Sequence, residues 1–354
     1  MKGENDNRMR ELSNFPRVER LIKDAVSEFG LDLKGISVLT EAASGPFITT
    51  CLIAASAGAD QIFAITRDSR YGTAQEIIEH TMRLARLLNI ENRVIVSSES
   101  PLKYASYSNL VTNLGFVRPI NKALIDLLPR DSAISLMWEP WEFRQEDIDM
   151  EACKRRGIPV LGTCETHPKL QTFRFVGMLA LKLLLESNIE VFLSKILVIG
   201  SGHFGIEIMN VMRANEAEAI LFDPTQGEIP HELEGFVSQC DAIVVAEHRD
   251  PFSVIGGGRG IPVSWIQSST TVIHICGRID YKWLIEHGIT KIPHQEALPG
   301  FMTVTTDYVG PRPVIDLHTA GLKVGEEMVR GMRITGDYLQ AVQHAIRNSP
   351  AMEF

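Results

Sequence analysis

Three kinds of segment are missing from this chain, and each absence narrows its possible functions. No basic block occurs and the formal net charge is −9, so we expect no nucleic-acid partner and no anionic membrane surface. The longest apolar stretch, near 177–185, contains Lys182 and is too short to span a bilayer. The first residues are polar and lack an apolar core, so we expect no secretory signal.

Cysteine is also scarce. The chain has five cysteines, an odd number, at scattered positions, which is typical of a reducing cytoplasm. Cys164 and His167 are close enough in sequence to suggest a metal fragment, but no second pair of ligands follows at a supporting spacing. The sequence therefore predicts a cytoplasmic protein without a metal site.

The segments that are present alternate between two periodicities. Short apolar runs at 35–40, 61–66, 93–96, 133–137 and 158–161 predict strands, and the stretches between most of them have helical spacing. Strands separated by helices form parallel sheets that are covered on both faces. With 354 residues, of which 45% are hydrophobic, the chain is long enough for two such α/β domains.

We place the domain boundaries from the same pattern. Residues 1–168 are expected to form the first α/β domain. A strongly apolar helix within 169–189 would link it, largely buried, to a second domain at 190–319. The helical pattern at about 320–354 would pack back on the first domain.

A strand, a glycine-rich turn, a helix, a second strand and an acid follow one another in 194–224. Gly200 permits a tight turn, Gly202 lets a pyrophosphate approach the backbone, and Gly205 lets the helix pack close to the strand. The helix N-terminus would then face the phosphates. This order of elements predicts a Rossmann dinucleotide-binding domain.

Asp223 follows Gly200 by 23 residues, where an acid accepts hydrogen bonds from both ribose hydroxyls and repels a 2′-phosphate. We therefore expect NAD rather than NADP. The alternatives are a glycine turn that binds nothing, or one that binds another nucleotide such as an S-adenosyl compound. The expected cofactor-binding residues are Gly200, Ser201, Gly202, His203, Phe204, Gly205, Asp223, Ala246, Glu247 and Cys276.

Polar and charged residues follow the strands of the first domain, at the edge where open α/β sheets bind ligands. Arginines there could bind an anionic group through two hydrogen bonds. Salt bridges and helix caps are the alternative, with Ser44 placed to cap the following helix. The candidate substrate residues are Ser44, Arg67, Arg70 and Tyr71. In the second domain, the glycines of 253–260 predict a flexible surface loop rather than a phosphate loop.

From about residue 147 to 330 the layout resembles the D-2-hydroxyacid dehydrogenase superfamily. The resemblance rests on Ile148-Asp149, on 156–160, on the glycine motif and on the strand at 241–246. It implies an arginine that binds a substrate carboxylate, a histidine that moves a proton, and a glutamate that orients the histidine.

The matching positions are Arg278, Glu296 and His318, with His294 as a rival for the histidine. One departure is that His274-Ile-Cys-Gly-Arg278 replaces the family's usual Asn-x-x-Arg-Gly. The resemblance therefore implies these roles, with His318 as the expected histidine because it precedes a long helical pattern, as the family's histidine does.

These observations together indicate an NAD-dependent oxidoreductase. It would act on a small anionic hydroxy, keto or amino substrate in the cleft between the domains, and it would form a homodimer. One alternative keeps NAD tightly bound through an internal redox cycle, as in enzymes resembling adenosylhomocysteine hydrolase. Another is a non-catalytic, dinucleotide-responsive binding module.

Overall fold

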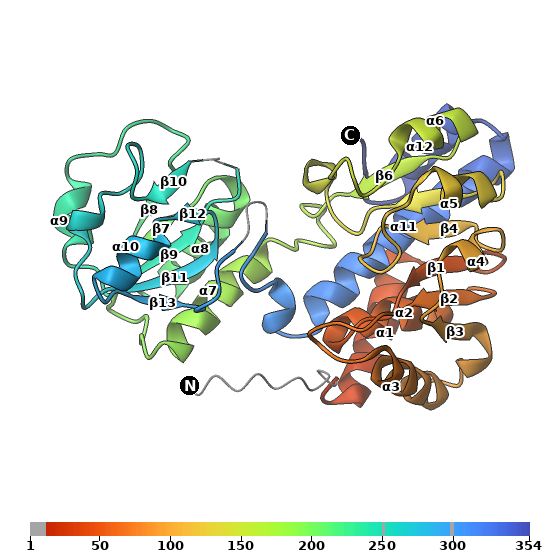
Figure 1. Ribbon diagram of the computed structural model, residues 1–354, viewed down its shortest axis with the longest axis horizontal. Helices are drawn as coiled ribbons and strands as arrows, with labels where there is room; N and C mark the ends of the chain where they lie inside the picture. The colour runs from red at the N-terminus through yellow and green to blue at the C-terminus, as the bar shows by residue number, and fades with distance from the viewer. Residues whose placement is uncertain (1–11, 250–251, 298–300) are drawn as a thin grey trace. The chain divides into compact units, whose positions relative to one another are not determined.

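The chain folds into two compact α/β units (Figure 1). The computed structural model describes residues 12–249, 252–297 and 301–354. Unit 1 comprises Met1–Gln171 and Pro311–Phe354, and unit 2 comprises Thr172–Gly310. The chain therefore leaves unit 1, completes unit 2, and returns to finish unit 1. Both units are built on mainly parallel sheets, so the expected fold class is confirmed.

The described part of unit 1 contains a seven-stranded sheet in the order β14-β6-β5-β4-β1-β2-β3. All neighbours are parallel except the edge strand β14, which pairs antiparallel with β6. The strands are β1 (Val38–Glu41), β2 (Ile62–Ile65), β3 (Val94–Ser97), β4 (Leu110–Thr112), β5 (Ala133–Ser135), β6 (Val160–Thr163) and β14 (Ala351–Met352).

Two of these strands are absent from the sequence-based expectation. β4 has only three residues and follows a short helix, so its apolar run is too brief to stand out from its surroundings. β14 has two residues at the end of the chain. The missed β4 is important, because it lies between β1 and β5 and so defines where the order of the sheet reverses.

Helices cover both faces of the unit 1 sheet (Figure 1). The apolar face of α1 is buried, and Gly30 ends the helix in the left-handed conformation with φ 59°. At α3, Thr73 and Glu76 form a capping box. The helices are α1 (Phe15–Phe29), α2 (Thr49–Ser56), α3 (Ala74–Leu87), α4 (Leu102–Ala105), α5 (Lys122–Leu127), α6 (Met150–Arg156), α11 (Arg312–Thr335) and α12 (Tyr338–Asn348).

Helix α11, which belongs to the returning segment, is buried over most of its length. It packs so closely on the sheet that a Cβ at Gly325 would lie 2.2 Å from a methyl carbon of Leu110, and one at Gly321 would lie 2.6 Å from Met137. A side chain at either position would force Leu110 or Met137 to shift.

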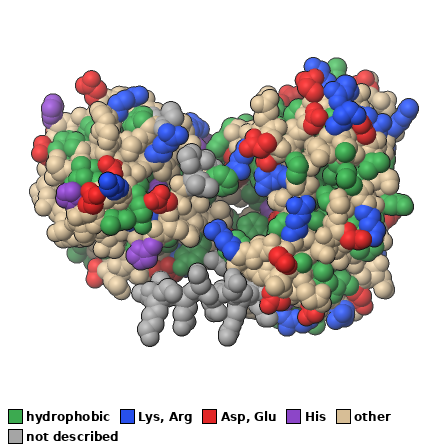
Figure 2. Space-filling model, viewed as in Figure 1, with side chains coloured by type: hydrophobic (Ala, Val, Ile, Leu, Met, Phe, Trp, Pro, Cys, Tyr) green, Lys and Arg blue, Asp and Glu red, His purple; other side chains and the backbone are tan. Residues whose placement is uncertain are grey.

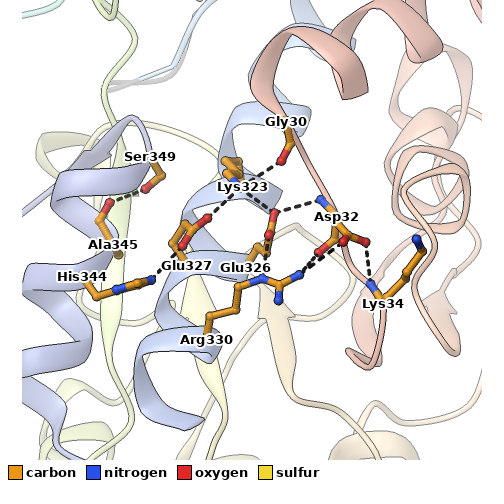
Figure 3. Close-up of polar contacts among 10 residues, drawn as sticks. All are labelled: Gly30, Asp32, Lys34, Lys323, Glu326, Glu327, Arg330, His344, Ala345 and Ser349. Carbon is orange, nitrogen blue, oxygen red and sulfur yellow. Dashed lines mark hydrogen bonds and ion pairs between the residues drawn. The ribbon is translucent and has the colours of Figure 1, made fainter. Parts of the chain in front are cut away.

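A network of charged groups ties α11 to the rest of unit 1 (Figure 3). The Lys323 ammonium lies 3.0 Å from Glu326 and 2.6 Å from Glu327, and it donates to the carbonyl of Gly30. Glu326 also accepts from Arg330, and Glu327 lies 2.9 Å from His344 of α12. Burial of these charges is tolerated because each finds an opposite charge or a hydrogen-bond partner.

Unit 2 has a five-stranded parallel sheet in the order β13-β11-β9-β7-β8, and a two-stranded pair of β10 with β12. The strands are β7 (Lys195–Ile199), β8 (Glu218–Phe222), β9 (Ala242–Ala246), β10 (Ser253–Ile255), β11 (Thr271–Cys276), β12 (Arg278–Ile279) and β13 (Thr290–Ile292). The helices are α7 (Arg174–Glu186), α8 (Gly202–Ala214), α9 (Leu233–Val237) and α10 (Tyr281–Glu286).

Three features of unit 2 differ from expectation. The 253–260 segment is not simply a surface loop, since it begins with β10 and a Cβ at Gly260 would lie 2.3 Å from the Ser253 carbonyl oxygen. The apolar helix α7 is not buried on most sides, because Met178 and Leu185 are 43% and 53% exposed. Unit 2 ends at Gly310 rather than 319, so the whole of α11 belongs to unit 1.

Candidate functional site

In the turn after β7, Gly200, Gly202 and Gly205 each occupy a position where a side chain would clash or would strain the backbone. A Cβ at Gly205 would lie 2.4 Å from the Gly200 carbonyl oxygen, so helix α8 packs directly against the turn. A Cβ at Gly200 would lie 2.8 Å from the Ala246 carbonyl oxygen. Gly202 has φ +53°, a conformation that side chains rarely adopt. The turn therefore depends on glycine at all three positions.

β7 lies between β8 and β9, so the sheet order reverses beside β7. Ligands of such sheets bind beyond the carboxyl ends of the strands at that point. The Gly200 turn and Ala246–Glu247 flank this position. Gly277, with φ +102°, lies against them as well, because its Cβ would meet the Glu247 carbonyl oxygen at 2.7 Å.

A buried carboxylate lies at the start of α8. Glu247 is 1% exposed, and its Oε1 accepts from the Ser201 hydroxyl at 2.8 Å and from the Arg249 N–H at 2.7 Å. The Arg249 guanidinium lies 3.2–3.3 Å from the point where a Cβ of Gly202 would stand. Arg249 thus covers the turn with a positive charge, a role that the sequence pattern does not assign to it.

Asp223 directly follows β8, as the sequence predicts for an acid that binds ribose. Its two carboxylate oxygens accept from Thr225 and from the side chain of Gln226, at 2.6–2.9 Å. These partners are exposed, so ribose hydroxyls could replace them. The carboxylate is fixed in place by its own loop.

Aromatic rings stack beside the turn. His203 stacks on Phe173 with ring centroids 5.4 Å apart, and His248 stacks on Phe204 at 4.4 Å. Burial, together with nearby Arg249, lowers the pKa of His248 to about 4, so this ring is neutral at pH 7. Cys276 is buried, and burial raises the pKa of its thiol.

Three of the expected catalytic residues lie in unit 2. Arg278 is exposed on β12, and His294 and Glu296 are exposed on the segment after β13. Lys291 organises that segment by donating to the carbonyl of Gln295 at 2.8 Å, and the Tyr281 hydroxyl donates to the carbonyl of His294 at 2.9 Å. No ion pair among the described residues joins Arg278 to Glu296.

His318 lies in unit 1, near the start of α11. It is 4% exposed, and its Nδ1 shares a hydrogen bond of 2.6 Å with the Thr50 hydroxyl of α2. The Phe47 ring centroid is 6.0 Å away. Burial lowers the pKa of His318 to about 3, so the ring is neutral. This is an unfavourable setting for a general base, whose pKa is best near the working pH.

The four expected substrate residues all belong to unit 1. Ser44 precedes the 3₁₀ turn η1 (Gly45–Ile48), but its side chain makes no capping hydrogen bond, so the capping alternative is wrong. Arg67 is exposed. The Arg70 guanidinium lies over the Tyr71 ring at 4.6 Å and donates to the Tyr71 hydroxyl. Arg70 and Tyr71 thus form one exposed pair.

Other kinds of site receive no support within the described residues. No group of three or more His, Cys, Asp or Glu side chains is arranged to hold a metal ion. No helix in that part of the chain is both long and apolar enough to cross a membrane. On the face shown in Figure 2, acidic and basic side chains are interspersed.

Comparison with known proteins gives a fold and no family. No family model and no curated protein matches the sequence. Among solved structures, a dipicolinate synthase chain from Bacillus halodurans aligns over 81% of this chain and 96% of its own, with 11% identity and a TM-score of 0.53.

Two further structures align with lower scores. NAD-dependent formate dehydrogenase from Staphylococcus aureus has 10% identity over 85% of this chain and 96% of its own, with a TM-score of 0.43. D-2-hydroxyisocaproate dehydrogenase has 13% identity over 85% and 98%, with a TM-score of 0.43. At these identities the likeness concerns the fold, so the chemistry must be argued from the residues.

Proposed function

We propose that this protein is an NAD-dependent oxidoreductase that acts on a small anionic hydroxy, keto or amino substrate. The observation that carries the proposal is the turn after β7, where three glycines allow a tight turn into α8 and Asp223 follows the next strand. This arrangement suits a dinucleotide, with pyrophosphate at the turn and ribose at Asp223. The two-unit fold shared with the dipicolinate synthase chain supports this architecture.

The decisive test is NAD titration of the full-length protein by calorimetry, with the variant Gly202→Asp. An aspartate there would add a side chain and a negative charge where the pyrophosphate is proposed to lie, so we expect NAD affinity to fall at least tenfold. Gly257→Asp is the matched control, because Gly257 also has positive φ but is exposed, and a Cβ there would meet only Ser253, at an ordinary contact distance of 3.7 Å. Unchanged NAD binding in Gly202→Asp would refute the cofactor site.

For the chemistry, we propose that Arg278 binds the substrate's anionic group and that Glu296 orients a histidine. His294 is separated from Glu296 by a single residue, whereas His318 is buried and neutral. Arg278→Gln should raise KM with a smaller change in kcat. Comparing His294→Asn with His318→Asn assigns the proton transfer, since only the true base should abolish turnover while leaving NAD affinity intact.

Ser44, Arg67, Arg70 and Tyr71 remain our proposal for additional substrate contacts. The pairing of Arg70 with Tyr71 presents a cation on an exposed loop. Replacing Arg67 and Arg70 together by glutamine should raise KM for an anionic substrate and leave NAD affinity unchanged. A KM equal to that of the original protein would remove these residues from the substrate site.

One observation favours a second candidate, a non-catalytic dinucleotide-responsive module. His318 occupies the position that the resemblance assigns to the catalytic base, yet it is buried against Thr50. This candidate predicts NAD binding without turnover of any hydroxy, keto or amino acid. Detection of NADH formed from such a substrate would exclude the non-catalytic module. It would also exclude the internal redox cycle, in which NAD stays bound and no NADH is released.

We also propose a homodimer. Met178 and Leu185 expose apolar surface on α7, and a second copy of the chain would cover it. Sedimentation of the double variant Met178→Glu, Leu185→Glu tests this. A dimer should dissociate in the variant, whereas a sedimentation coefficient that does not change would contradict the proposed interface.

A further inference from the structure

Unit 1 has its own point where the order of a parallel sheet reverses. The chain runs from β1 to β2 and β3 on one side, then returns to β4, β5 and β6 on the other side of β1. Sheets of this order bind nucleotides beyond the carboxyl ends of the strands at the reversal. In unit 1 that position lies between the residues after β1 and those after β4.

The same spacing of residues occurs there as in unit 2. Gly45 follows β1 in the left-handed conformation, with φ +60°. Asp68 comes 23 residues after Gly45, as Asp223 comes 23 residues after Gly200. A glycine turn, a helix, a second strand and an acid thus recur in unit 1.

A buried hydroxyl points to a ligand beside this turn. Thr66 directly follows β2, is 0% exposed, and its Oγ1 has no hydrogen-bond partner among the residues that the structure describes. In β2, Ile62 and Ala64 pack in the same apolar cluster as Ile48 and Leu52 of the η1–α2 segment. Because side chains alternate along a strand, Thr66 faces that side too. The hydroxyl therefore lies on the face of the sheet where the Gly45 turn leads into α2.

Leaving a buried hydroxyl without a partner is costly, so such groups call for an explanation. Thr66 directly follows β2, as Asp223 directly follows β8, and Asp68 comes two residues later. In unit 2 we assign that place to ribose. A ribose hydroxyl in unit 1 would give the Thr66 Oγ1 its missing partner.

The residues of the Gly45 turn restrict which chemical group of the ligand can approach the backbone. Gly45 lies four residues beyond the end of β1, whereas Gly200 directly follows β7. Counted from Gly45, the positions of Gly202 and Gly205 are taken by Phe47 and Thr50, whose side chains contact His318. A pyrophosphate could not approach this backbone as it could in unit 2.

A buried carboxylate lies at the reversal itself. Glu41, at the end of β1, is 6% exposed and accepts from the N–H of Phe116, beyond β4, at 3.0 Å. Burial is the main influence on the Glu41 carboxyl and raises its pKa, while nearby Arg118 opposes this. A negative charge at this position would repel a phosphate and attract a cation.

We infer that unit 1 binds a nucleoside between the ends of β1 and β4, one whose 5′ substituent is uncharged or cationic rather than a phosphate. The Thr66 hydroxyl contacts its ribose, and Glu41 lies beside its 5′ substituent. The ribose contact rests on the ribose site proposed at Asp223, but the residues of this site belong to unit 1 and are different ones.

Calorimetry on the full-length protein tests this with three probes: adenosine, S-adenosylmethionine, whose 5′ substituent carries a sulfonium cation, and AMP. We expect adenosine or S-adenosylmethionine to saturate one site per chain, with AMP at least tenfold weaker. The same binding should persist in Gly202→Asp, which separates this site from the one in unit 2. Absence of binding by both adenosine and S-adenosylmethionine, AMP affinity equal to theirs, or loss in Gly202→Asp would each overturn the inference.

Thr66→Val removes the hydroxyl without changing the shape of the side chain. We expect nucleoside affinity to fall at least fivefold while the melting temperature stays the same or rises by about 2–4 °C, because no protein hydrogen bond is lost. Thr81→Val is the control, since Thr81 is equally buried but its hydroxyl bonds Ile77 within α3. Full affinity in Thr66→Val would contradict the proposed ribose contact.

Glu41→Gln gives a second, independent measurement. It keeps an acceptor for the Phe116 N–H and cannot carry a negative charge. The preference for S-adenosylmethionine over AMP should shrink at least fivefold. An unchanged preference would show that Glu41 does not select the 5′ substituent, and would overturn that part of the inference.

Discussion

Units 1 and 2 follow one plan and differ at the turn after their first strand. In unit 2 the turn contains Gly200, Gly202 and Gly205, and the helix begins against bare backbone. In unit 1 only Gly45 remains, and Phe47 and Thr50 fill the other two positions. The comparison teaches that strand order locates a ligand site, whereas the side chains of the turn decide how closely a ligand approaches the backbone.

The units also differ in how their cores are tied together. Unit 2 is one continuous stretch of chain. Unit 1 is closed by a returning segment whose helix α11 carries buried charges, among them Lys323, Glu326 and Glu327. Removing one partner from such a group leaves an uncompensated charge, so unit 1 should be the more sensitive to single charge deletions.

Lys323→Met should produce the largest effect. It leaves Glu326 and Glu327 without their shared cation, and we expect a loss of about 3–5 kcal/mol in the free energy of unfolding. Urea denaturation measures this. Lys282→Met in unit 2 removes a cation from an exposed pair with Glu286 and should change stability by less than about 0.5 kcal/mol. Equal losses of stability in Lys323→Met and Lys282→Met would contradict the greater sensitivity of unit 1 to charge deletions.

Exchanging the turn residues should produce the next largest effect. Gly205→Thr places a side chain 2.4 Å from the Gly200 carbonyl oxygen and should cost about 3 kcal/mol, with loss of NAD binding. The reverse change, Thr50→Gly, removes the bond to His318 and should cost only about 2 kcal/mol. Thermal melting and NAD titration of both variants decide whether the two turns are interchangeable.

Asp223→Ser tests whether the acid after β8 binds ribose and selects NAD over NADP. Serine removes the charge that would repel a 2′-phosphate, so NAD affinity should fall about tenfold, or about 1.4 kcal/mol, and the ratio of NADP to NAD affinity should rise. Glu228→Ser, on the exposed loop after β8, is the control and should leave the ratio unchanged. An unaltered ratio in Asp223→Ser would exclude Asp223 from the ribose site.

The smallest expected effect concerns pH. Burial lowers the pKa of His318 to about 3, whereas an unfolded histidine has a pKa near 6.5. The unfolded chain therefore binds the extra proton as pH falls below 6.5, and the folded state loses stability on that side. His318→Phe should remove about 1 kcal/mol of the stability difference between pH 7.5 and pH 5.5. His231→Phe, at an exposed position, should leave that difference unchanged.

Much of this architecture could be predicted because it depends on local patterns. The α1 face, the glycine turn after β7 and the acid after β8 each follow from residue types at fixed spacing. β4 and β14 could not be predicted, because strands of three and two residues are defined by their neighbours in the sheet rather than by their own sequence. Without β4, the reversal in unit 1 could not be recognised.

In the candidate site, too, some features follow from local sequence spacing and others depend on tertiary packing. The glycines and Asp223 were predictable from spacing, since each serves a backbone or charge requirement. The place of Arg249 over Gly202 and the burial of His318 against Thr50 were not, because they depend on packing between segments distant in sequence. For Arg249 the sequence offered only one hint, a cation shortly after a strand that borders the glycine turn.

The division of unit 1 into two chain segments has a consequence for synthesis on the ribosome. Every residue of unit 2 has been made once Gly310 is joined, whereas unit 1 still lacks α11, α12 and its edge strand β14. Domains fold as units while the chain grows. Unit 2 should therefore reach its native structure first, and unit 1 should wait, with the sheet face that α11 covers exposed, until α11, α12 and β14 have emerged.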